Sequence, residues 1–296
     1  MGFNLWEGIG KDHELLRKVY SEDNYRVIDT GRATGKCLIC FSGNGLFYPN
    51  TEETFKRMVV DGDRYEWSNM TKSPELHEYY QRIILIRDIY KQWYVTGISF
   101  RFNNVNSVAD LLRDLVTVEG GRLSVYTVGY SAGGYAALLF GMLLGAKRIF
   151  NFSGQYDLNE EIYKNGELVA PFLKEYKDSA GRYYDLKPLL QNRLGFGTIY
   201  YFFPCLCDWD KRQHESVKNI KGIKSFLFNN KNHGDTVYGG VEIDILTSDD
   251  EKLLEVCASP QPFSKFSFAR HYHSLAKCLI LVLKNVRKKV RKLFKA

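Results

Sequence analysis

The sequence has no low-complexity stretch and no internal repeat, so nothing in it points to a disordered or solenoid protein. Its first residues, 1–7, lack the charged start and the apolar core of a secretory signal peptide. Trp6 occupies the position at which an N-myristoylation signal requires serine or threonine. We therefore expect a cytoplasmic protein that carries neither a cleaved leader nor that lipid anchor.

The few cysteines do not form a metal-binding pattern. Cys37 and Cys40 have C-x-x-C spacing, but both fall in the strand-like run of residues 36–41. An odd spacing along a strand points two side chains to opposite faces of a sheet, so these thiols cannot converge on one ion. We expect buried free thiols, and we predict neither a metal nor another cofactor. The six cysteines are Cys37, Cys40, Cys205, Cys207, Cys257 and Cys278.

Acidic residues are absent from residues 277–296, which carry eight Lys and Arg residues. The net charge of the whole chain is +7, so residues 1–276 sum to −1 and the basicity belongs to the C-terminal segment. Apolar residues recur in this segment at helical spacing, which predicts a basic amphipathic helix. Its apolar positions are Leu279, Leu283, Val286, Val290, Leu293 and Phe294.

Three roles for this C-terminal helix are open. It could be a solvated helix packed on the core, or it could contact nucleic acid, although residues 1–276 offer no matching basic pattern. A helix on an anionic membrane surface fits the apolar stripe and the cationic face together. The segment is too charged to span a membrane. We expect residues 1–276 to form a single domain, with no nucleic-acid partner.

Apolar runs without polar alternation recur along residues 1–276 and are separated by helix-like segments, such as residues 107–118 and 134–144. This pattern predicts an α/β fold of three layers, in which helices cover both faces of a mostly parallel sheet. The polar, tyrosine-rich residues 157–196 fall between two strands, and we expect them to form a lid-like insertion. The predicted strands are residues 25–29, 36–41, 82–87, 123–128, 148–152, 199–203 and 224–228.

Residues 129–133 read Gly-Tyr-Ser-Ala-Gly between a predicted strand and a predicted helix. This G-x-S-x-G context is typical of a nucleophile elbow, in which glycines permit a sharp turn that exposes the serine hydroxyl. The helix that follows directs free N–H groups at the reacting centre. We therefore predict that Ser131 is a nucleophile.

A serine nucleophile needs a base and an orienting acid, and both should follow later strands. His233 comes directly after the last predicted strand, and Asp208 and Asp210 come after the strand before it. We predict His233 as the base and favour Asp210 as the acid, at the start of a helix over residues 211–217, with Asp208 as the alternative. His271 and His273 are lesser candidates for the base.

An oxyanion formed at Ser131 needs backbone N–H donors. Ala132 follows the nucleophile and supplies one. The other should come from the loop after the strand of residues 36–41, where Gly43 and Asn44 are the candidates.

This order of motifs resembles the α/β-hydrolase superfamily over residues 36–235. The resemblance implies an α/β-hydrolase-type three-layer sandwich in which Ser131 is the nucleophile, His233 the base and Asp210 or Asp208 the acid. Residues 42–45, Ser-Gly-Asn-Gly, depart from the His-Gly-Gly-Gly loop of lipases and esterases, so a simple lipase is not implied. More narrowly, the chain is similar to α/β-hydrolase-like O-acetyltransferases of bacterial surface-polysaccharide clusters.

The narrower resemblance implies that an O-acyl group, such as acetyl, is transferred to or removed from a saccharide, with an acetyl donor for the transfer. The 43 aromatic residues suit stacking on sugar rings. The acyl-enzyme would pass its acyl group to water or to a sugar hydroxyl, and the sequence leaves this choice open. A general carboxylesterase or thioesterase and an inactive hydrolase-fold binding module are the alternatives. A basic helix at the inner face of the membrane would suit work on lipid-linked glycans.

Overall fold

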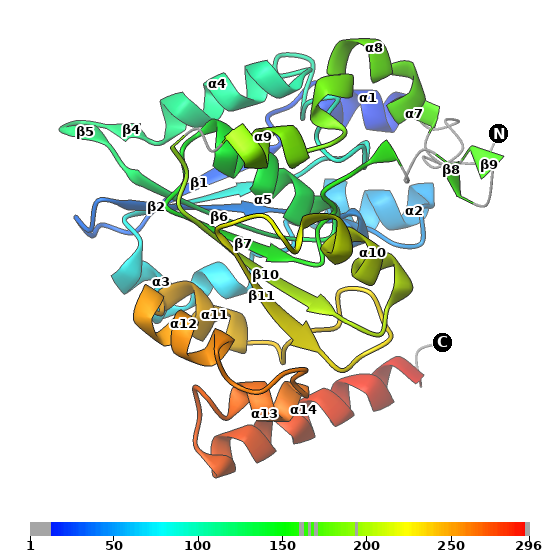
Figure 1. The fold of residues 1–296 in the computed structure, drawn as a ribbon. Helices are drawn as coiled ribbons and strands as arrows, with labels where there is room; N and C mark the ends of the chain where they lie inside the picture. The colour runs from blue at the N-terminus through cyan, green and yellow to red at the C-terminus, as the bar shows by residue number, and fades with distance from the viewer. Residues whose placement is uncertain (1–12, 160–162, 165–166, 169–170, 193–194, 294–296) are drawn as a thin grey trace.

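A seven-stranded sheet runs through the centre of the computed structural model, which describes residues 13–159, 163–164, 167–168, 171–192 and 195–293 (Figure 1). The strand order is β1-β3-β2-β6-β7-β10-β11, and β1 runs antiparallel to its neighbour whereas the other pairs are parallel. The mostly parallel sheet is thus confirmed. The strands are β1 (Tyr25–Asp29), β2 (Lys36–Phe41), β3 (Arg82–Ile86), β6 (Ser124–Tyr130), β7 (Arg148–Phe152), β10 (Thr198–Pro204) and β11 (Ile223–Phe228).

The central strands are apolar on both faces because helices cover both faces. In β2, Cys37, Ile39 and Phe41 enter one hydrophobic core, and Leu38 and Cys40 enter the core on the opposite face. The prediction that Cys37 and Cys40 point apart is confirmed, and all six cysteines are free.

Helices form a layer on each side of the sheet, which confirms the three-layer architecture (Figure 1). The layer of the first core comprises α4 (Val105–Leu115), α5 (Ala132–Leu143), α7 (Pro171–Glu175), α8 (Lys177–Ala180) and α9 (Lys187–Asn192). The layer of the second core comprises α3 (Pro74–Tyr79), α11 (Val241–Thr247), α12 (Asp250–Cys257) and α13 (Lys265–Ala269). The further helices are α1 (Glu14–Tyr20), α2 (Glu52–Phe55), α10 (Asp208–Val217) and α14 (Leu275–Leu293).

Short elements connect these helices and strands. They are the 3₁₀ turns Asn44–Leu46, Met70–Lys72 and Gly181–Tyr183, the π-helical turn Lys56–Val60, and the paired strands β4 (Thr117–Val118) with β5 (Gly121–Arg122) and β8 (Tyr163–Lys164) with β9 (Glu167–Leu168).

The bounds of α4 and of α5 differ from the prediction. The helix predicted over residues 107–118 is α4, which begins at Val105 because Asn104 and Ser107 form a capping box. It ends at Leu115 because Thr117–Val118 pair with Gly121–Arg122 in a small hairpin. The helix predicted from residue 134 begins at Ala132, directly after the serine of the elbow.

The described helices of residues 157–196 pack on the α4 and α5 side of the molecule (Figure 1). The Tyr135 hydroxyl on α5 donates to the carbonyl oxygen of Tyr183 at 2.6 Å, and the Tyr183 hydroxyl donates to Asn106 at 2.8 Å. Residues 160–162, 165–166, 169–170 and 193–194 of this insertion lie outside the described residues. A lid over the reacting serine therefore stays a prediction.

Helix α14 lies at the edge of the molecule, beyond α13 (Figure 1). Cys278 is buried and Leu281 packs on the second core, so this side of the helix faces the protein. The side chains of the predicted apolar stripe that the structure describes face outward instead, since Leu283 is 59% exposed and Leu279 and Val286 are each 51% exposed. Phe294, the last member of that stripe, lies outside the described residues. None of the helices in the described part of the chain is long and apolar enough to cross a membrane.

Candidate active site

Ser131 makes the turn between β6 and α5 in a strained backbone conformation. Its φ of 53° and ψ of −121° are costly for a residue with a side chain, and they persist only where the surroundings enforce them. The two glycines of the pentapeptide make this turn possible. A Cβ on Gly129 would lie 2.1 Å from the Gly133 carbonyl oxygen, and one on Gly133 would lie 2.4 Å from that of Phe41. The local sequence therefore forms the sharp strand-to-helix turn that a nucleophile elbow requires.

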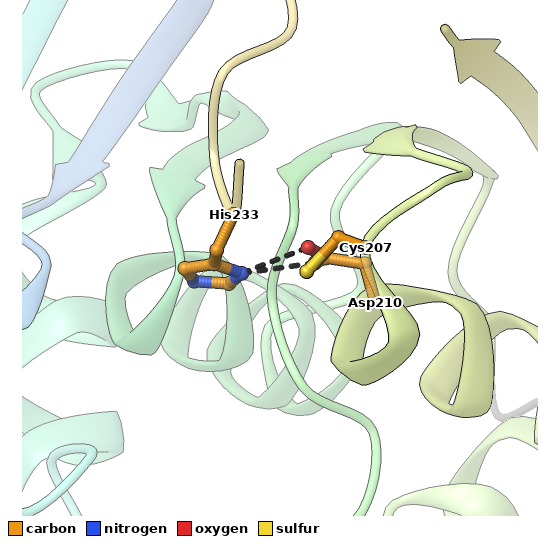
Figure 2. A group of neighbouring side chains, drawn as sticks. All are labelled: Cys207, Asp210 and His233. Atoms are coloured by element: carbon orange, nitrogen blue, oxygen red, sulfur yellow. Dashed lines mark hydrogen bonds and ion pairs between the residues drawn. The ribbon is translucent and has the colours of Figure 1, made fainter. Parts of the chain in front are cut away.

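Ser131, His233 and Asp210 form a continuous hydrogen-bonded relay. His233 Nε2 lies 2.8 Å from Ser131 Oγ. His233 Nδ1 lies 2.9 Å from Asp210 Oδ2 and 3.1 Å from Oδ1 (Figure 2). The three side chains come from the segments that follow β6, β10 and β11, and the carboxyl ends of these parallel strands meet at one edge of the sheet. This geometry suits proton transfer from the serine to the histidine.

The residue at which α10 begins determines which of the two aspartates points toward His233. The helix begins at Asp208 and not at residue 211 as predicted, so both aspartates lie in its first turn. Residues two apart on a helix point in different directions. Asp210 is 2% exposed and meets His233, whereas Asp208 is exposed to solvent. Asp210 is therefore the acid that the fold brings to the histidine.

The two lesser candidates for the base lie elsewhere. His273 pairs with Asp244 at 3.0 Å, and the ring of His271 packs edge-on against Phe263. Neither histidine belongs to the relay, so the prediction that either could serve as the base is wrong.

The prediction of Gly43 as an oxyanion donor needs correction. Its backbone N–H donates to Glu66 Oε2 at 2.6 Å and is not available for a substrate. Gly43 is required for a different reason, since a Cβ there would lie 2.7 Å from the Tyr130 carbonyl oxygen. Ala132 is the first residue of α5, and Asn44 is the first residue of the 3₁₀ turn after β2. The backbone N–H groups of these two residues remain the predicted donors.

Glu66 and Trp67 hold the loop of residues 42–45 from one side, and neither residue was predicted from the sequence. Trp67 Nε1 donates to the Phe41 carbonyl oxygen at 2.9 Å, and its ring stacks on Tyr130. Burial raises the pKa of the Glu66 carboxyl, and the Gly43 N–H partly opposes this rise. These residues lie on a segment without regular structure, and no local motif marks them.

A strained loop after β3 holds the same residues from the other side. Lys91, Trp93 and Tyr94 have φ angles of 55°, 52° and 62°. The buried Asp88 carboxylate stabilises this conformation because it accepts backbone N–H bonds from Tyr90, Gln92 and Tyr94. The Tyr94 hydroxyl donates to the Ser42 carbonyl oxygen at 2.8 Å, and Asn44 Nδ2 donates to the Lys91 carbonyl oxygen at 3.4 Å.

Lys91 is buried, and no carboxylate of the described residues forms an ion pair with its ammonium group. Its Nζ donates to the Phe47 carbonyl oxygen and to Asn50 Oδ1, and it lies 3.7 Å from the centre of the Phe47 ring. Burial lowers its pKa to about 7. Through these bonds the strained loop also fixes the segment that follows the predicted oxyanion loop.

Two side chains of the β10–α10 segment adjoin the histidine. The ring of Trp209 lies 4.3 Å from that of His233, centre to centre. Cys207 immediately precedes α10, and its sulfur lies within 4.8 Å of ligand atoms of both Asp210 and His233 (Figure 2). No sequence pattern indicates a role for Trp209 or Cys207, because both residues matter only through their closeness to His233, which lies more than 20 residues later.

Replacing Asp210 by asparagine should lower kcat/KM for an activated acetyl ester by roughly 10⁴-fold, because the imidazole loses the partner that sets its tautomer and orientation. Asp208→Asn is the matched control on the same helix turn, and it should leave turnover almost unchanged because Asp208 is exposed. Steady-state hydrolysis of p-nitrophenyl acetate measures both. If Asp208→Asn were the damaging change, the identity of the acid would be wrong.

No protein-family model matches the chain, and no curated protein matches it in sequence. Among solved structures, the capsule O-acetyltransferase of Neisseria meningitidis serogroup A matches with a TM-score of 0.50 and 15% identity, over 80% of this chain and 92% of that chain. The fluorophosphonate-binding serine hydrolase F of Staphylococcus aureus matches with a TM-score of 0.49 and 12% identity, over 78% of this chain and 96% of that chain. Acyl-protein thioesterase 2 of Zea mays matches with a TM-score of 0.45 and 13% identity, over 80% of this chain and 100% of that chain.

The strand order, the elbow and the first of these likenesses agree on the architecture. The chain has the α/β-hydrolase fold. At 15% identity the likeness concerns the fold alone, so the function has to be argued from the site.

Proposed function

We propose that this chain is a serine-dependent acyl-transfer enzyme that forms an acyl-enzyme on Ser131. The observation that supports this proposal most strongly is the relay at the elbow, with 2.8 Å from Ser131 Oγ to His233 Nε2 and 2.9 Å from His233 Nδ1 to Asp210. A serine in a purely structural turn needs neither a histidine at its hydroxyl nor a buried acid behind that histidine.

The proposed reaction has two half-reactions. Ser131 Oγ attacks the acyl carbonyl carbon while His233 Nε2 takes the hydroxyl proton, and the N–H groups of Ala132 and Asn44 stabilise the oxyanion. The tetrahedral intermediate collapses, and His233 gives the proton to the leaving group. An acceptor hydroxyl then loses its proton to His233, attacks the acyl-enzyme and frees Ser131. Asp210 keeps Nδ1 protonated, so that Nε2 is the basic nitrogen.

For the substrate we propose an O-acyl group, most simply acetyl, on a saccharide of a surface polysaccharide. The ring of Trp209 supports a sugar, because it places a partly exposed aromatic side chain 4.3 Å from the His233 ring at the reacting centre. A general carboxylesterase or thioesterase would use the same acyl-enzyme with a different leaving group. A catalytically inactive binding module would not need the relay.

The acceptor is tested by supplying an acetyl donor with and without a saccharide acceptor. A transferase should form acetylated sugar at the expense of free acetate, and the products are separated by mass spectrometry. Free acetate released at the same rate in both reactions, with no acetylated sugar, would favour the esterase over the transferase.

We also propose that α14 docks the protein on an anionic membrane surface at the cytoplasmic face. Its apolar stripe is unpartnered along the described part of the helix, where Leu279, Leu283, Val286 and Val290 are 51, 59, 51 and 42% exposed. The same segment carries eight basic and no acidic residues. Each basic residue near an anionic leaflet contributes about 1 kcal/mol, so several together suffice for reversible binding.

Replacing Leu283, Val286 and Val290 by glutamine should abolish sedimentation with phosphatidylglycerol vesicles, because it removes the apolar face and keeps the helix and its charge. About 0.5 M salt should release the wild-type protein, since it screens the attraction to the lipid headgroups. Leu254→Gln on α12 is the control, because Leu254 is 41% exposed and lies outside the stripe. Equal vesicle binding by the triple variant would contradict membrane docking. A dimer that dissociates in that variant would instead assign the stripe to a second copy.

A further inference from the structure

Cys207, Asp210 and His233 form a compact cluster of metal-binding side chains within the candidate active site (Figure 2). Cys207 precedes α10, Asp210 lies in the first turn of that helix, and His233 follows β11. One ligand atom from each lies within 4.8 Å of the other two. Across the part of the chain that the structure describes, this is the one group of three His, Cys, Asp or Glu side chains so placed. The serine relay uses Asp210 and His233 and does not itself require the Cys207 thiol.

The donor set fits zinc. Thiolate, imidazole and carboxylate are the ligands that Zn²⁺ prefers, and three protein ligands leave a fourth tetrahedral position open to water. Given the usual bond lengths, the ligand atoms of a tetrahedral zinc site lie roughly 3.3–3.8 Å apart. His233 Nδ1 and Asp210 Oδ2 are 2.9 Å apart, so a small opening of this pair and an approach of the thiol complete the site. The His233 side chain is 25% exposed and Cys207 is half-buried, so an ion can reach them from solvent.

We propose that Cys207, Asp210 and His233 bind Zn²⁺ and that the bound ion switches the enzyme off. The Cys207 thiol releases its proton to solvent and binds the ion as thiolate, and Asp210 binds through one carboxylate oxygen. His233 binds through Nδ1, so its single ring proton moves to Nε2. That nitrogen then donates to Ser131 Oγ and can no longer accept the serine proton. The inhibition rests on the proposed function, whereas the metal site does not.

Cobalt and zinc test the site directly. Co²⁺ added to the wild-type protein should give the charge-transfer absorption of a thiolate-bound ion, and Zn²⁺ should displace it with a stoichiometry of one. Loss of a residue that only orients a metal ligand already weakens metal binding by about 10- to 100-fold, so removal of a ligand itself by Cys207→Ser should weaken it by at least about 100-fold. Cys205→Ser is the matched control, because Cys205 lies two residues away and outside the cluster. It should bind as the wild type does.

Inhibition is measured separately, as the Zn²⁺ concentration that halves each protein's own metal-free rate of ester hydrolysis. This concentration should rise at least about 100-fold in Cys207→Ser and stay unchanged in Cys205→Ser, and a chelator should restore full activity. Equal inhibition of both variants, or Co²⁺ binding without a thiolate band, would overturn the proposal. If the protein hydrolyses no ester, the cobalt spectrum still tests the metal site, so failure of the proposed function is distinguishable from failure of this inference.

Discussion

Ser131→Ala should lower kcat/KM by roughly 10⁶-fold, because it removes the atom that forms the acyl-enzyme. The expected loss is this large because, once the nucleophile is absent, the histidine has no serine proton to take and the acid has no imidazolium to stabilise, so the three residues act as a unit. What remains is catalysis by binding and by the oxyanion donors alone. Steady-state hydrolysis of an activated ester, compared with the rate in buffer, measures the loss.

The variant should keep its fold, which makes the result interpretable. Alanine carries the same Cβ as serine, so the backbone strain at φ 53° is unchanged. The Ser131 backbone N–H still donates to the Phe152 carbonyl oxygen at 2.8 Å. Thermal unfolding monitored by circular dichroism should therefore give nearly the wild-type midpoint. Turnover at the wild-type rate in a folded Ser131→Ala protein would remove the serine from the mechanism.

His233→Ala should lower kcat/KM by about as much, roughly 10⁶-fold, because the serine hydroxyl loses the base that lies 2.8 Å away. The double variant Ser131→Ala with His233→Ala should be no slower than either single variant, since each change already disables the same unit. Kinetics of the two single variants and the double variant measure this non-additivity.

His271→Ala is the control for the second prediction, because His271 was an alternative base and lies against Phe263. It should retain turnover. Two fully additive losses in the double variant would mean that Ser131 and His233 act independently, and this would contradict the relay.

The parts of the site that follow strand ends were predictable from the sequence, because the signal is local. The elbow needs a strand, a glycine-flanked serine and a helix in succession, and His233 needs only to follow the last strand. The choice of Asp210 over Asp208 depends on where α10 begins. The sequence predicted that the helix begins at residue 211, which would leave both aspartates outside it. The directions in which the Asp208 and Asp210 side chains point could therefore not be predicted.

Contacts between distant segments account for what the sequence did not predict. The Gly43 N–H donates to the carboxyl of Glu66, 23 residues later, and no local sequence pattern predicts that bond. The outward orientation of the apolar stripe on α14 could not be predicted from the sequence either. An amphipathic helix has the same periodicity whether its apolar face packs on a core or points to solvent, and the exposure of Leu283 distinguishes the two cases.

Intact-protein mass after treatment with a fluorophosphonate tests the central claim most directly, since such a probe phosphonylates a serine only where a base activates it. The wild-type protein should gain the mass of one phosphonyl group, and Ser131→Ala should gain none. Equal labelling of both proteins, or a wild-type protein that stays unlabelled, would contradict the assignment of Ser131 as an activated nucleophile.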